Sequence, residues 1–152
     1  MSDQAAVDSF LALSAGVMVV AFIWGVIAYL FTAFALYKMG RNQGFDDAFF
    51  AFIPVLNYKT WGDLLETKAP DFLKPQTGWK VFGVFIALII LNLIPLLNII
   101  AVIAGAVLGV WMLYALLDRY TVNAGVWTVV HIITGCFFFP IHLFVIRNNQ
   151  PR

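Results

Sequence analysis

Hydrophobic and polar positions along the chain fall into long apolar runs separated by short polar segments. The first run extends from Phe10 to Tyr37, with no charged residue between Asp8 and Lys38. At about 1.5 Å per residue, a helix of this length exceeds the roughly 30 Å of hydrocarbon in a bilayer. Signal peptides are shorter and begin with basic residues. We therefore expect a permanent membrane-spanning helix over residues 10–37.

The second apolar run extends from Val81 to Leu117 and is far too long for a single crossing. Pro95 and Asn98 lie near its middle. Proline disfavours helix at the preceding residue, and asparagine tolerates turn conformations. The pattern therefore predicts a helical hairpin. Its expected arms are residues 79–94 and 97–117.

The third apolar run has the length of one further span, over residues 126–146, and is closed by Arg147. Pro140 interrupts this run late, which neighbouring helices tolerate within lipid. Asp118 and Arg119, between the second and third runs, are expected to anchor a span end at the interface.

A shorter segment over residues 45–56 cannot cross a bilayer, because its apolar core is too short. Asp46 and Asp47 stand in its first turn, where acidic residues suit the helix dipole. We expect an amphipathic helix, and the sequence leaves open whether it lies on the interface or re-enters the membrane. Residues 67–77 are expected to form an exposed polar loop.

Composition agrees with this pattern. Of the residues, 62% are hydrophobic and 11% charged, against roughly 45–50% and about 25% in soluble domains. The expected fold is a single all-α membrane domain over residues 1–152, with about four transmembrane helices plus the short interfacial or re-entrant helix. The lipid bilayer is its expected surrounding. The net charge of +1 and the lack of a basic cluster argue against nucleic acid.

Basic residues predict the orientation. The segment between the first two spans, residues 38–80, contains most of the Lys and Arg, and the N-terminal segment contains none. Cytoplasmic loops carry an excess of these residues. Loop 38–80 is therefore expected to be cytoplasmic, and four spans would then place both termini outside.

An Ile-Pro-x-x-Asn pattern occurs twice, at residues 53–57 and 94–98. Proline ends or bends a helix, and the asparagine amide can bond freed backbone groups. The pattern is interpreted either as helix ends at the membrane surface or as broken helices that form a polar site. The residues expected to break helices are Pro54, Asn57, Pro95 and Asn98, with Pro140 in a weaker third copy.

Four segments carry a family resemblance. They are Lys38 to Gly44, Ile53 to Tyr58, Ile94 to Asn98, and Phe138 to Ile141. Over residues 36–145 the chain resembles a large family of small polytopic bacterial membrane proteins of unknown function. The resemblance implies a multi-helix protein of the bacterial inner membrane and transfers no activity. Some relatives are labelled signal peptidases.

The residues do not support a hydrolase. The serines are Ser2, Ser9 and Ser14, all remote in sequence from an activating base. His131 and His142 would share one face of a helix over 126–146, about 16 Å apart along it. They are weak candidates for haem or pigment ligation; alternatively, each bonds a neighbouring helix or lies at the interface. No enzyme activity, cofactor or metal site is expected.

Gly105 and Gly109 have the Gly-x-x-x-Gly spacing that lets helix backbones approach closely, so they are candidates for a helix contact. The preferred hypothesis is a non-enzymatic membrane subunit or scaffold that associates with other membrane proteins or with itself. A small oligomeric transporter or channel, and a haem-binding or pigment-binding subunit, are the alternatives.

Overall fold

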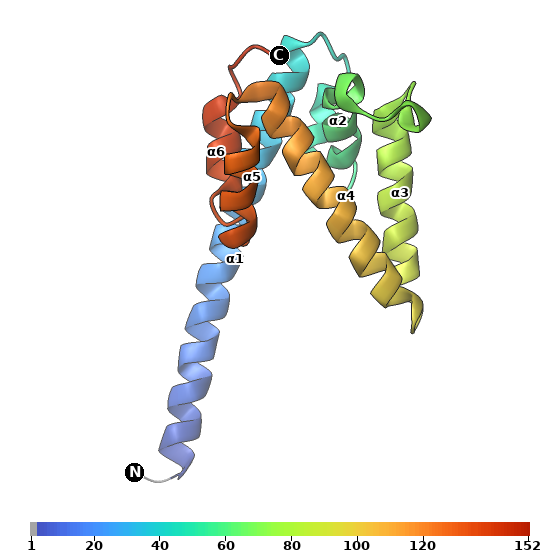
Figure 1. The fold of residues 1–152 in the computed structure, drawn as a ribbon. Coiled ribbons are helices and arrows are strands. Elements are labelled where there is room, and N and C mark those ends of the chain that lie inside the picture. The colour runs from blue at the N-terminus through green and yellow to red at the C-terminus, as the bar shows by residue number, and fades with distance from the viewer. Residues whose placement is uncertain (1–2) are drawn as a thin grey trace.

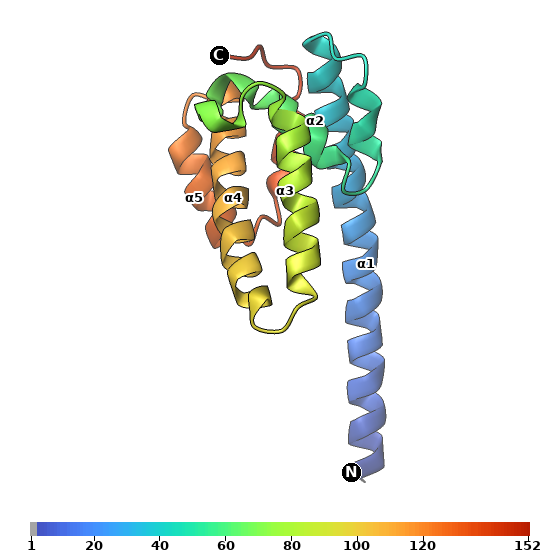
Figure 2. The ribbon, with the colours of Figure 1, turned by 90° about the vertical axis from the view of Figure 1, so that its right-hand side faces the viewer.

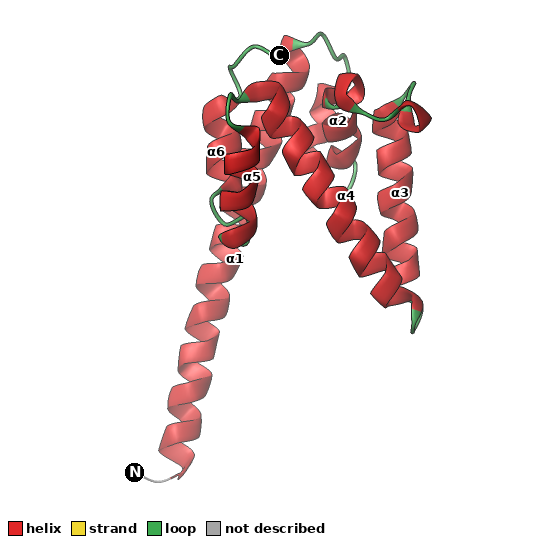
Figure 3. Cartoon of the chain, viewed as in Figure 1, coloured by secondary structure: helices red, strands yellow, loops and turns green. Residues whose placement is uncertain are grey.

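The computed structural model describes residues 3–152, and within that range the chain is helical, without strands (Figure 3). This confirms the expected all-α class. The elements are α1 (Asp3–Asn42), α2 (Asn57–Leu64), α3 (Thr77–Asn92), α4 (Leu97–Tyr120), α5 (Ala124–Ile133) and α6 (Phe139–Ile146), with 3₁₀ turns η1 (Ala48–Phe52), η2 (Glu66–Lys68) and η3 (Asp71–Leu73).

The long helix α1 is the axis of the molecule. The other elements gather around its C-terminal part, and its N-terminal part stands alone beyond them (Figure 1). Two helices are long and apolar enough to cross a membrane, Gln4–Asn42 and Leu97–Tyr120. The helices α3 and α5 are also apolar but shorter.

After α1 the chain forms three hairpins. The first hairpin (residues 45–64) pairs η1 with α2, the second (residues 77–120) pairs α3 with α4, and the third (residues 124–146) pairs α5 with α6. The segments that connect the hairpins lie together at one end of the molecule, which we call the loop end. The tip of the second hairpin points away from that end (Figure 2).

The expectation of a single helix over residues 126–146 is wrong. The helix α5 ends at Ile133, and a turn containing Gly135 and Cys136, both with positive φ, reverses the chain into α6. The C-terminus therefore returns to the loop end, where the N–H of Arg152 donates to the carbonyl of Arg119 at 2.8 Å. The start of α1 lies at the opposite end of the molecule (Figure 1).

The segment 45–56 is not one amphipathic helix. It forms the short turn η1, reverses, and continues into α2. The hydroxyl of Tyr29 donates to the carbonyl of Phe52 at 2.9 Å. Tyr29 lies thirteen residues before the end of α1 at Asn42, which is about 20 Å along the helix axis. The first hairpin therefore dips alongside α1 and returns, as a re-entrant segment does.

Both Ile-Pro-x-x-Asn copies build the same turn. The residue after the proline has positive φ, 67° at Val55 and 72° at Leu96. In each copy the asparagine N–H donates to the isoleucine carbonyl four residues earlier, at 3.0 and 3.1 Å. Positive φ is uncommon for bulky side chains, so its recurrence marks a shared backbone structure. The pattern thus reverses the chain between two helical segments.

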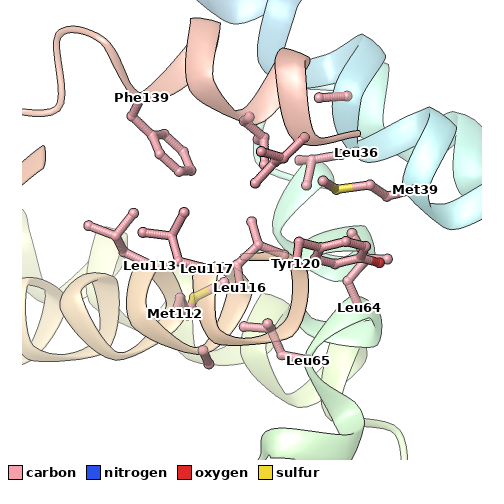
Figure 4. Close-up of a cluster of buried hydrophobic side chains, with 14 of the residues drawn as sticks. Leu36, Met39, Leu64, Leu65, Met112, Leu113, Leu116, Leu117, Tyr120 and Phe139 are labelled. Carbon is pink, nitrogen blue, oxygen red and sulfur yellow. The ribbon is translucent and has the colours of Figure 1, made fainter. Parts of the chain in front are cut away.

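The hydrophobic core lies at the loop end (Figure 4). It joins the end of α1 to α2, the C-terminal half of α4 and the third hairpin. Its fully buried side chains include Leu36, Met39, Leu64, Leu116, Leu117 and Leu143. The remaining hydrophobic surface, along α1 and around the second hairpin, is largely exposed.

One close approach between two helices involves glycines that the sequence did not single out. A Cβ on Gly62 of α2 would lie 2.7 Å from the Cα of Gly78 of α3, and a Cβ on Gly78 would collide with the Asp63 carboxylate. By contrast, a Cβ on Gly109 would meet nothing within 4 Å, and one on Gly105 only a Leu88 methyl at 3.8 Å. The contact expected at Gly105 and Gly109 is not a close backbone approach within this chain.

Gly78→Ala is therefore expected to lower the free energy of unfolding by about 1–3 kcal/mol, because the new methyl overpacks the α2–α3 contact. Thermal unfolding of the detergent-solubilised protein measures this effect. Gly83→Ala is the matched control on the same helix, since a Cβ there meets nothing within 4 Å. Equal melting temperatures for the two variants would contradict the contact.

Candidate functional site

A cavity of about 590 Å³ lies where the first and third hairpins meet α1, α3 and α4. Most of the side chains that line it are apolar or aromatic, and none of them carries a formal charge. Ligand pockets in proteins have similar volumes and a similar mixture of apolar walls and a few polar groups. The cavity is therefore the main candidate for a binding site.

Two polar atoms in this lining are unsatisfied. The Oδ1 atom of Asn57 and the Nε1 atom of Trp61 are buried and have no hydrogen-bond partner among residues 3–152. The two residues are four apart on α2, so they share a face and are separated by about 6 Å along the axis. The Trp61 ring is fixed by stacking on Phe139, with 5.6 Å between ring centroids. The two unsatisfied atoms have almost no accessible surface, so they lie behind the lining and do not face the cavity.

The predicted helix-breaking residues separate into two places. Asn57 and Pro140 line the cavity. Pro95 and Asn98 are exposed at the tip of the second hairpin, and Pro54 is exposed at the tip of the first. The two Ile-Pro-x-x-Asn copies therefore do not meet within one chain. The tips of the first and third hairpins meet instead.

Gly105 and Gly109 also line the cavity. Because they have no side chains, the face of α4 that they form leaves open space where larger residues would project. Their role within the chain is thus to shape the cavity wall.

The two histidines lie much closer together than one straight helix would allow. The Nε2 atom of His131 lies 2.8 Å from the Nδ1 atom of His142, across the third hairpin. The separation of about 16 Å expected on one helix is wrong, because α5 and α6 are antiparallel. The hydrogen bond occupies one nitrogen of each ring. Among residues 3–152, no three His, Cys, Asp or Glu side chains are grouped as a metal site.

A partly buried ion cluster lies nearer the loop end. The ammonium of Lys59 pairs with Asp47 and with Asp63, the latter at 2.7 Å, and lies over the rings of Phe50 and Trp79. Burial lowers the pKa of Lys59, but the hydrogen bonds to the two carboxylates outweigh it and leave this pKa raised. Burial raises the pKa of Asp63 in spite of Lys59. The lysine therefore stays charged near neutral pH.

Arg119 is a structural residue of the loop end. It is 7% exposed and donates to the carbonyl of Leu64 and, at 2.6 Å, to the side-chain oxygen of Gln43. Asp118 pairs with Lys68 at 2.6 Å. Sequence reasoning placed Asp118 and Arg119 at an interface. It did not anticipate that Arg119 is buried and joins α1, α2 and α4.

The sequence pattern indicates that Lys59 and Trp61 anchor this segment at headgroup level. It did not predict that Lys59 pairs with Asp63, although their four-residue spacing was an available signal, because such pairs meet on a helix surface. It did not predict the stacking of Trp61 on Phe139, because this contact depends on the packing of the third hairpin.

Comparison with family models, with curated proteins and with solved structures finds no match for this chain. The shared turn of the two Ile-Pro-x-x-Asn copies is an internal property of the fold.

Lys59→Met is expected to lower the free energy of unfolding by about 1–3 kcal/mol, because it leaves the half-buried Asp63 carboxylate without its partner. Lys68→Met is the matched control. Its pair with Asp118 is more than one-third exposed, and such pairs contribute about 0–1 kcal/mol. Denaturant titration of both variants in detergent measures the difference. If Lys59→Met lowers the free energy of unfolding no more than Lys68→Met does, the cluster has no stabilising role.

Proposed function

We propose that this chain is an integral membrane protein that acts as a non-enzymatic subunit, associating with other membrane proteins through the N-terminal half of α1. The observation that carries this proposal is the exposure of that half. The most apolar 18-residue window of α1 has 0% of its residues buried. Apolar surfaces of this extent mark membrane or protein interaction sites.

The second hairpin supports a membrane environment. Its tip is apolar and exposed, with Leu93 at 80% and Leu96 at 82% exposure, and apolar side chains continue along the outer face of α4. Lipid or partner helices would cover these side chains. A water-soluble fold would leave them in contact with water at a large free-energy cost.

The placement of charge supports one orientation. The fold of the third hairpin brings Arg147 and Arg152 back to the loop end, beside Arg119. The other six Lys and Arg of the nine lie between the end of α1 and the start of α3, also toward that end. Under the positive-inside rule, the loop end faces the cytoplasm of the bacterium that the family resemblance implies. The start of α1 then faces outside.

A groove along α1 supports helix association. It has a volume of about 860 Å³, is lined by small residues that include Ala12, Gly16 and Ala21, and ends at Trp24 and Phe137, whose rings stack at 4.5 Å. Small residues let two membrane helices approach closely and gain van der Waals contact. The partner that fits this groove is a membrane-spanning helix of another protein.

Gly16→Leu is expected to reduce the copurified partner at least about tenfold, because a leucine would fill the groove that receives the partner helix. A Cβ at Gly16 meets nothing within 4 Å, so the variant should fold normally. The measurement is native mass analysis after mild detergent extraction from native membranes.

Ser14→Leu is the control, since Ser14 lies about 160° away around the helix. It should retain the partner at the wild-type level. A wild-type protein that is strictly monomeric and free of partners would contradict the proposal, as would equal retention of the partner by Gly16→Leu.

A further inference from the structure

We infer that the cavity between the first and third hairpins binds a membrane-soluble quinone, a flat and uncharged ring that carries carbonyl oxygens and an apolar tail. Three features of the described lining support this ligand: an accessible hydroxyl at Tyr58, aromatic rings in stacked pairs, and the lack of charged residues. The quinone shares the membrane environment of the proposed function but not the association through α1, because the cavity and the groove have no lining residue in common.

The hydroxyl of Tyr58 is available to a ligand. Tyr58 lines the cavity, and its hydroxyl has no hydrogen-bond partner among residues 3–152 and is not one of the buried unsatisfied atoms. Its ring is fixed by stacking on Phe85, with 3.7 Å between ring centroids and 12° between ring planes. A phenolic hydroxyl can donate a hydrogen bond. An acceptor on the ligand would therefore meet a donor whose position is already set.

The other polar side chains of the lining fit the same ligand. The Oδ1 atom of Asn57 is shut off from the cavity, whereas its Nδ2 atom is not among the buried atoms and donates to no residue in the described chain. The hydroxyls of Tyr29 and Thr32 already donate to carbonyls of the chain, both at 2.9 Å. An amide nitrogen only donates. The donors left for a ligand are those of Asn57 and Tyr58, so the ligand has to supply an acceptor such as a carbonyl oxygen.

Two stacked aromatic pairs in the lining favour a flat ring. Tyr58 stacks on Phe85 of α3, and Trp61 stacks on Phe139 of α6 with 14° between ring planes. Both pairs extend from α2, and all four rings belong to the lining. A planar ring gains stacking contact with aromatic faces, whereas an acyl chain has no matching face. A quinone joins such a ring and its carbonyl oxygens in one group.

Charge and size limit the ligand further. No residue of the described lining carries a formal charge, and an ionised phosphate or carboxylate in apolar surroundings needs a partner of opposite charge. The cavity has a volume of about 590 Å³, within the range of known ligand pockets, and is partly open. Gly105 and Gly109 leave one wall free of side chains. A planar ring can therefore approach the backbone of α4, and an apolar tail can leave through the opening.

The test uses 2,3,5-trimethyl-6-decyl-1,4-benzoquinone and the full-length protein in detergent micelles. Every ring carbon of this probe is substituted or carries oxygen, so the thiol of Cys136 in the lining finds no open position for addition. Binding of the tritium-labelled probe to immobilised protein is measured, and the amount held by empty resin is subtracted.

Two unlabelled competitors each lack one recognised group. The compound 1-decyl-2,4,5-trimethylbenzene keeps the flat ring and the tail but has no carbonyl oxygen. The compound 2-hexadecanone keeps a carbonyl oxygen and an apolar chain but has no ring. Each should compete at least about tenfold more weakly than the unlabelled quinone, because it loses either the hydrogen bonds or the stacking.

Tyr58→Phe should lower the affinity for the quinone about threefold to tenfold, because it removes one hydrogen bond and keeps the stacked ring. The fold should be retained, since this hydroxyl bonds to no residue in the part of the chain that the structure describes. Tyr114→Phe is the matched control, because Tyr114 is exposed on α4 and lies outside the lining. It should bind the quinone as the wild-type protein does.

Gly109→Leu should weaken binding of the quinone at least about tenfold, because the leucine fills the cavity. A Cβ there meets nothing within 4 Å, and leucine favours helix over glycine, so the fold should be retained. Gly83→Leu is the matched control, since that position is equally open but lies outside the lining.

Saturable binding that falls in Tyr58→Phe and Gly109→Leu, but not in their controls, supports the quinone site. The site is overturned if the wild-type protein shows no saturable binding, or if either competitor matches the unlabelled quinone. It is also overturned if each variant binds like its control. Such a failure leaves copurification of a partner with the wild-type protein unchanged, whereas failure of the proposed association leaves binding of the quinone unchanged.

Discussion

Each reversal of this chain between helical segments has to satisfy its own backbone hydrogen bonds, because a buried backbone group without a partner is costly. The Ile-Pro-x-x-Asn turn does so with one bond from the asparagine N–H to the isoleucine carbonyl, and it uses positive φ at Val55 and Leu96. The third hairpin uses Gly135 and Cys136 for the same purpose. Three such reversals give three hairpins: the first and third pack on α1, and the second packs on α2 and α5.

These reversals also determine where charge and function can lie. Because each hairpin returns to its starting end, the polar segments, the Lys59 cluster and the bonds of Arg119 collect at the loop end. The opposite part of α1 is left apolar and exposed. The tips of the first and third hairpins bring Asn57 and Pro140 to one cavity within the apolar region. A charged end, an apolar arm and a partly open cavity therefore follow from the same hairpin topology.

The sequence predicted the parts of this fold that depend on local pattern. The apolar run 10–37 lies within α1, and the expected arms 79–94 and 97–117 correspond closely to α3 and α4, because apolar length and a central proline are local signals. The run 126–146 has the length of one span, and only the backbone at Gly135 and Cys136 divides it. The cavity was not predictable, because Trp61 and Phe139 meet only through tertiary packing. Gly62 and Gly78 were missed for the same reason.

The most direct test of this hairpin topology is the sidedness of single cysteines in membranes, in a chain whose own Cys136 is replaced by serine. Cysteine is introduced at Ala5, Thr67 and Gln150, and intact cells or spheroplasts are treated with a membrane-impermeant maleimide. We expect positions 67 and 150 to react from the same side and position 5 to react from the other. If positions 5 and 150 react from one side and position 67 from the other, residues 126–146 cross the membrane as a single helix. That result would contradict the account.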